Sequence, residues 1–83
     1  MGQRKQPARR CIHGMIVPAK RDQVGKILSV AIQTTSKHEY LVEQSWIGQE
    51  LNSYIYENVI AEGSFRERLD GKMIINVKKY QKL

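Results

Sequence analysis

The sequence predicts a small, mostly β domain with one short helix, and three observations support this fold class. Two stretches within residues 58–80 alternate apolar and polar side chains with the period of two that is typical of half-buried strands. Residues 26–34 and 38–44 show the same period. Between these two groups, residues 45–57 change to the period of an amphipathic helix. The predicted order is therefore strands, a helix, and then a hairpin.

Length and composition favour one soluble domain. The 83 residues allow a single compact core. The one cysteine, Cys11, excludes an intramolecular disulfide and favours a reducing compartment, and no apolar run is long enough to span a bilayer. Arg9-Arg10 before an apolar stretch is a feature of export signals, but this stretch is short and ends at Pro18 without a small-residue cleavage site. We therefore expect a cytoplasmic protein.

The positive charge is concentrated near the start of the chain. The net charge is +6, and residues 1–10 contain four bases and no acid, whereas the remainder contains ten bases and eight acids. Residues 1–10 are polar and lack hydrophobic periodicity, so we expect a disordered basic arm followed by one domain over residues 11–83. The arm is either functional or a solubilising or expression-derived end. Its bases are Arg4, Lys5, Arg9 and Arg10.

The first two strands are expected at residues 11–17 and 26–34. Gly14 lies within the first of them, and a glycine inside a strand commonly marks a sharp bend. Residues 18–25 form a loop by composition, with proline and glycine at its two ends. In the second strand one face is expected to point inward and consists of Leu28, Val30 and Ile32. The outward face consists of Ser29, Ala31 and Gln33.

The third strand, residues 38–44, has one favourable phase. Burying Tyr40 and Val42 leaves Glu39, Leu41 and Glu43 outside. The opposite phase would bury two glutamates, and unpaired buried carboxylates are costly.

The helix is expected over residues 45–57, with Ser45 or Gly48 capping its start. Trp46 precedes the helical stripe, and we expect it to close one end of the core rather than to serve as a ligand platform. The stripe itself consists of Ile47, Leu51 and Ile55.

The last two strands form a hairpin with a three-residue loop, Leu69-Asp70-Gly71, in which Gly71 takes the left-handed position. This loop length fixes a register that sets apolar residues opposite one another on one face and a favourable charge pair on the other. The facing pairs are Phe65 with Ile75, Gly63 with Val77, and Glu62 with Lys78.

This order of elements resembles the OB fold, and particularly the small single-domain bacterial OB-like proteins. The resemblance covers residues 11–83 and rests on the glycine-bent first strand, the polar loop before Lys26, the short helix and the final hairpin. It implies a five-stranded Greek-key barrel with the helix between strands three and four. An SH3-like barrel is the nearest competitor, but it has no natural place for a helix of this length.

The resemblance implies binding of single-stranded nucleic acid or oligosaccharide on the outer face of strands two and three. Single-strand binding uses aromatic side chains inside a positive groove. The matching face here has no aromatic residue, no base and two carboxylates, so it departs from that pattern. Its residues are Ser29, Ala31, Gln33, Glu39, Leu41 and Glu43.

Two loops supply the remaining candidates for binding single-stranded DNA or RNA. In the OB arrangement the first loop and the hairpin loop flank the same cleft, so their bases would converge there. The alternative is that these side chains simply solvate exposed loops. The bases are Lys20, Arg21 and Lys26 in the first loop and Arg66, Arg68 and Lys72 near the hairpin loop, assisted by those of the arm.

A second hypothesis is a module for protein interaction or self-association. Ile60, Ile74 and Tyr80 would form an apolar patch outside the barrel, unless the arm or the helix covers it.

Signatures of other functions are sparse. The sequence has no glycine-rich phosphate loop, nucleophile elbow or evident carboxylate pair, so we expect no enzyme, cofactor or small-molecule substrate. Cys11, His13 and His38 lack the paired spacing and the fourth ligand of a closed zinc site, so we expect no metal. The arm has neither an acylation site nor an amphipathic helix, which argues against membrane binding.

Overall fold

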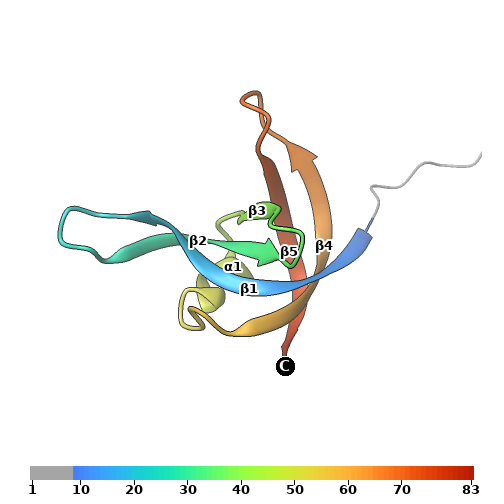
Figure 1. Ribbon diagram of the computed structural model, residues 1–83, viewed down its shortest axis with the longest axis horizontal. Helices are drawn as coiled ribbons and strands as arrows, with labels where there is room; N and C mark the ends of the chain where they lie inside the picture. Colours follow the sequence, from blue (N-terminus) through green and yellow to red (C-terminus); the bar gives the residue numbers. More distant parts are fainter. Residues whose placement is uncertain (1–8) are drawn as a thin grey trace, which may run out of the picture.

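The chain folds into a closed barrel of five strands with one short helix (Figure 1). The computed structural model describes residues 9–83. The mostly β fold class, with the helix between the third and fourth strands, is confirmed. In chain order the elements are β1 (Arg9–Arg21), β2 (Ile27–Thr34), β3 (Glu39–Val42), α1 (Trp46–Leu51), β4 (Asn58–Glu67) and β5 (Met73–Lys82).

The strands follow the order β1-β2-β3-β5-β4 around the barrel, and β4 pairs with β1 to close it. Neighbouring strands are antiparallel except β3 and β5, which are parallel. In Figure 1 the β1–β2 hairpin extends to the left, whereas the β4–β5 hairpin extends upward. The tips of the two hairpins therefore point in different directions, and only the parts nearer the barrel approach a common face.

β1 is longer than the expected strand at residues 11–17. It pairs with β4 from Arg9 to Met15 and with β2 from Gly14 to Arg21. Gly14 thus lies where β1 changes partner, and a Cβ atom there would come 2.5 Å from the carbonyl oxygen of Gln33. Only glycine permits this close approach of two strands. Residues 9 and 10 of the expected arm belong to β1, and residues 1–8 lie outside the described residues.

The β4–β5 hairpin has the expected loop. The Arg68 amide donates to the Lys72 carbonyl, which encloses a three-residue turn, and Gly71 has a φ of 88°. The predicted apolar pairs are both observed: Phe65 faces Ile75, and Gly63 faces Val77.

The expected pairing of Glu62 with Lys78 is wrong. A β-bulge between Glu62 and Gly63 shifts the register by one residue, so Glu62 faces Lys79. Their side chains form an ion pair with 3.5 Å between Nζ and Oε1. The same shift places Tyr80 opposite Ala61.

The helix is shorter than expected and ends at Leu51 rather than near residue 57. Ser45 caps its start, and its hydroxyl oxygen accepts a 2.9 Å hydrogen bond from the Gly48 amide. Asn52 and Ser53 follow, and both residue types favour turns over helix interiors because their side chains compete for backbone hydrogen bonds. The remaining residues to the start of β4 form turns that include Tyr56 at a φ of 68°.

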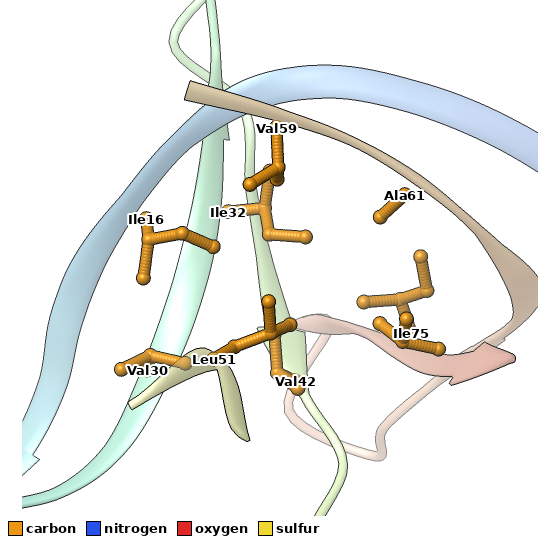
Figure 2. Packing of buried hydrophobic residues seen from close by; sticks show 9 residues of the cluster. Ile16, Val30, Ile32, Val42, Leu51, Val59, Ala61 and Ile75 are labelled. Carbon is orange, nitrogen blue, oxygen red and sulfur yellow. The ribbon is translucent and has the colours of Figure 1, made fainter. Parts of the chain in front are cut away.

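The core draws side chains from all five strands and from the helix, and Figure 2 shows how they converge inside the barrel. The inward phases expected for the strands are observed at these positions. At the edge of this cluster Tyr40 and Phe65 pack edge to face, with ring centroids 5.3 Å apart. The core residues are Ile16, Val30, Ile32, Val42, Leu51, Val59, Ala61, Ile75 and Val77.

Two residues of β2 differ from the expected alternation. Leu28 was expected inside but is 41% exposed. It has no partner in β1, because Lys20 pairs with Ser29 and Arg21 pairs with Ile27. At this point the β1–β2 hairpin leaves the barrel, so the inward phase of β2 no longer faces the core.

Ala31 was expected outside but is fully buried. Its cross-strand neighbours are Val17 and Leu41. A methyl group between two larger side chains is covered by them, so this position is buried without facing the core.

Within residues 9–83, no helix is both long enough and apolar enough to cross a membrane.

Candidate nucleic-acid interface

A groove of about 380 Å³ lies on the outer face of β2 and β3, where the β1–β2 hairpin leaves the barrel. All five strands contribute to it: β1 and β2 on one side, β3 in the centre, and β4 and β5 on the other. The turns after β3 and β4 extend it. Its lining residues are Lys20, Leu28, Ser29, Val30, Leu41, Val42, Glu43, Gln44, Arg66, Arg68 and Ile74.

Three of the six predicted loop bases meet in this groove: Lys20 from β1, Arg66 from β4, and Arg68 just after β4. Arg66 and Arg68 share one face of the chain because they are two residues apart. Lys20 sits between two register irregularities that begin at Pro18, which has no amide hydrogen to donate to the ladder. Bulges of this kind commonly redirect a side chain beside a binding site.

The groove bases have different partners. Arg66 forms an ion pair with Glu43 at 3.4 Å, and Arg68 forms one with Asp70 at 3.1 Å. Lys20 forms no ion pair within the described residues. Both pairs are exposed, and exposed ion pairs typically contribute only about 0–1 kcal/mol, so a phosphate can compete for either arginine. Without a ligand, the carboxylate of Glu43, expected to repel phosphate, is paired with Arg66.

The groove also contains apolar side chains. Leu28, Leu41 and Ile74 are all partly accessible and line it beside the cations. Leu28 reaches this position because it faces away from the core. Apolar side chains cannot bind phosphate but can contact the faces of unstacked bases.

A second hollow, of about 460 Å³, adjoins the groove across Leu41, which lines both. Lys72, the fourth predicted loop base, lies here with Lys37 and His38 from the β2–β3 turn. Lys37 was not among the predicted binding residues because a lysine in a turn is usually only solvated. The parallel pairing of β3 with β5 brings its turn beside Lys72.

Arg21 and Lys26 lie in the β1–β2 hairpin and do not line the groove. The Arg21 guanidinium donates to the carbonyl oxygen of Gly25 at 3.0 Å. The loop is also held by Asp22, whose carboxylate accepts from the amides of Val24 and Lys26. These contacts keep the loop compact at the far end of the hairpin.

Two of the four arm bases fall in β1. The backbone of Arg9 pairs with Ser64, and the Arg10 guanidinium lies 4.4 Å from the centroid of the Phe65 ring. Arg4 and Lys5 lie outside the described residues.

Trp46 does not close the core and is 87% exposed, so that expectation is wrong. Ile47, Gly48 and Leu51 face inward, and successive helical residues are about 100° apart, which turns Trp46 to the outer face with Gln49 and Glu50. This phase was readable from the sequence, because Trp46 is three and four residues from Gln49 and Glu50, and all three lie off the apolar stripe.

The three residues of the expected interaction patch do not form one surface. Ile74 lines the groove, opposite Arg66. Tyr80 packs against the core cluster, and its ring lies 6.1 Å from that of Tyr54. Ile60 is 37% exposed and lines a separate hollow of about 310 Å³ together with Tyr80.

Tyr80 also joins the last strand to the helix. Its hydroxyl donates a 2.9 Å hydrogen bond to Oε1 of Glu50. Desolvation by burial raises the pKa of Tyr80, and the hydrogen bond to Glu50 raises it further. The phenol therefore keeps its proton well beyond the usual range.

Residues 9–83 contain no group of three or more His, Cys, Asp and Glu side chains placed to hold a metal ion. Cys11 and His13 are exposed on β1, and His38 lies in the β2–β3 turn. The arrangement offers cations and apolar contacts, which suit the binding of a polyanion with hydrophobic groups. The sequence matches no protein-family model and no curated protein, so the argument for function rests on these residues.

Proposed function

We propose that this protein is a non-enzymatic OB-fold domain that binds single-stranded nucleic acid in the groove on β2 and β3. One observation carries the proposal: Lys20, Arg66 and Arg68, from distant parts of the chain, line one groove together with apolar side chains. The closed five-stranded barrel, with its helix between β3 and β4, is compatible with the OB fold, whose ligands commonly bind on this face.

A single strand suits the groove better than a duplex. Its cations can contact phosphates, while Leu28, Leu41 and Ile74 can contact base faces that a duplex keeps stacked. The adjoining hollow adds Lys37 and Lys72, so a strand lying across Leu41 would meet cations on both sides of β3. Binding of this kind is strongly salt-dependent and largely independent of sequence.

A protein-interaction module has less support, because Ile74 lines the groove, whereas Ile60 and Tyr80 line a separate hollow. It becomes the first alternative if neither DNA nor RNA binds.

The proposal is tested by fluorescence anisotropy of labelled dT12 and rU12 with the full chain at 100 mM salt. Lys20→Glu should weaken binding about tenfold or more, because it removes one phosphate contact and adds a repulsive charge. Lys78→Glu is the matched control: Lys78 is also exposed and unpaired within the described residues, but it does not line the groove. It changes the net charge equally and should alter affinity by less than about threefold.

Equal effects of the two substitutions would show that only net charge matters, and the groove would then not be the binding site. Absence of binding by the unsubstituted chain would reject the proposed function itself.

A further inference from the structure

Trp46 is the most exposed aromatic side chain of the described residues, and it lies beside the cationic groove. It is 87% exposed, although tryptophan is usually largely buried in folded proteins. It packs into no part of the core, which the barrel closes with Leu51 and with the partly buried Ile47. The fold therefore gives no structural reason for a tryptophan at this position.

The surroundings of Trp46 connect it to the groove. Trp46 lines a shallow hollow with Gln44, Ser45 and Gln49, and Gln44 also lines the groove. The Gln44 side chain donates a 3.3 Å hydrogen bond to the carbonyl oxygen of Leu28, which fixes the chain between β3 and α1 against the start of β2. The hollow and the groove therefore meet at a residue that is held in place.

The backbone position of Trp46 is also defined. Ser45 caps α1 through the Gly48 amide, so Trp46 is the first helical residue and its backbone is fixed. Gln49 lies one turn further on the same outer face, and its side-chain amide forms no hydrogen bond within the described residues. A flat aromatic surface thus stands beside a free hydrogen-bonding group.

We infer that Trp46 is a stacking platform for a nucleobase at the end of the strand bound in the groove. This inference rests on the proposed function. The groove cations indicate which group would contact the tryptophan. Lys20, Arg66 and Arg68 would hold the phosphates of a strand, and the next base of that strand would then lie beside Trp46. The indole stacks on that base, and the Gln49 amide faces the base edge.

Trp46 does not belong to the outer face of β2 and β3. That face itself contains no aromatic residue. Stacking on an aromatic side chain tolerates any base, because every base has a π face. Trp46 therefore adds affinity for bases without strong preference among them, and it distinguishes a nucleic acid from a polyanion that lacks bases.

The test uses the intrinsic fluorescence of the full chain, since Trp46 is its only tryptophan. Titration with unlabelled dT12 should quench this fluorescence, with the same dissociation constant that anisotropy gives. Inorganic polyphosphate should compete with labelled dT12 for the cations but leave the fluorescence of Trp46 unchanged. Quenching by polyphosphate equal to that by dT12 would contradict stacking.

Substitution provides the second readout. Trp46→Ala should weaken dT12 binding about tenfold or more, within the range expected for one lost stacking contact, whereas Trp46→Phe should retain most of the affinity. Tyr56→Asn is the matched control: Tyr56 is 62% exposed, does not line the groove, and has a positive φ that asparagine accepts. Because both rings are exposed, each variant should melt within a few degrees of the unsubstituted chain.

The outcomes separate this inference from the proposed function. If anisotropy reports binding but Trp46 is not quenched and Trp46→Ala binds as the unsubstituted chain does, the stacking platform is rejected and the groove remains. If the unsubstituted chain binds neither dT12 nor rU12, the proposed function and the platform are both rejected. Capture of a protein at Trp46 under those conditions would identify an interface of a different class.

Discussion

At the scale of single residues, the side-chain hydrogen bond from Tyr80 to Glu50 connects the helix to the barrel. It joins α1 to β5 beside the Tyr54 ring. Because both desolvation and this bond favour the protonated phenol, the pKa of Tyr80 is raised in the folded state. An unfolded chain releases the same proton near pH 10. The contribution to stability is therefore fully present below about pH 10 and is lost as the pH rises above it.

We predict that Tyr80→Phe lowers the free energy of unfolding by about 1 kcal/mol at pH 8, because it removes this bond. At pH 11 the difference from the unsubstituted chain should be smaller, because the unsubstituted chain has by then lost part of the contribution. Urea denaturation followed by circular dichroism at both pH values measures the difference. Tyr56→Phe is the control, since the Tyr56 hydroxyl forms no hydrogen bond within residues 9–83. A Tyr80→Phe difference that is the same at pH 8 and pH 11 would contradict the assignment.

Residue-scale expectations from the sequence succeeded where neighbours in the same strand decide burial. The alternation in β4 and β5 placed Val59, Ala61, Ile75 and Val77 in the core. It failed at Leu28, because alternation does not say where a strand leaves the barrel. Burial therefore depends on how far each strand stays within the barrel as well as on its period.

At the scale of elements, the β4–β5 hairpin contains two glycines with different physical roles. A Cβ atom at Gly63 would overlap the carbonyl oxygen of Asn76, because the bulge brings the two backbones together. Gly71 has a φ of 88°, but a Cβ atom there would meet nothing within 4 Å. Gly63 is required because there is no room for a side chain, and Gly71 is required because its backbone has a positive φ.

We predict that Gly63→Ala destabilises the barrel by about 2–3 kcal/mol, because the strand must move to admit a methyl group. Gly71→Asn should cost less than about 1 kcal/mol, since asparagine tolerates the left-handed conformation. Urea denaturation of both variants provides the comparison. Similar losses at the two positions, or a larger loss at Gly71, would show that the bulge does not limit the space at Gly63.

The hairpin register was predictable because the turn residues and the facing apolar pairs are local in sequence. The bulge that moved the partner of Glu62 to Lys79 was not, since one extra residue in a strand leaves both alternating patterns intact on either side. The predicted helix was too long for a related reason. Ile55 continues the spacing of Ile47 and Leu51 and packs against the core, but it does so from a turn rather than from α1.

At the scale of the whole molecule, barrel closure assembles the candidate site. Lys20 and Arg68 are 48 positions apart in the sequence and become neighbours of one groove only because β3 pairs with both β2 and β5. The resemblance to a known fold predicted this convergence in part. It did not place Arg21 and Lys26, because the length of the β1–β2 hairpin carries them beyond the groove.

The salt dependence of binding distinguishes the groove from the basic arm. Each phosphate contact to a single strand contributes about −0.7 to the slope of log K against log salt. The three groove bases therefore predict a slope of about −2 when they alone contact the strand. Contacts by the arm would make the slope steeper.

We predict that the double variant Arg4→Gln/Lys5→Gln keeps a slope of log K against log salt of about −2 or steeper, because the contacts of Lys20, Arg66 and Arg68 remain. Lys20→Gln should reduce the magnitude by about 0.7, whereas Lys78→Gln, outside the groove, should leave it unchanged. Anisotropy titrations of dT12 between 50 and 300 mM salt measure all three slopes. If neutralising Arg4 and Lys5 removes the salt dependence and the binding together, these two residues bind the strand and the groove does not. If the slope persists without the charges of Arg4 and Lys5 and falls when Lys20 is neutralised, the closed barrel itself provides the cations that bind the strand.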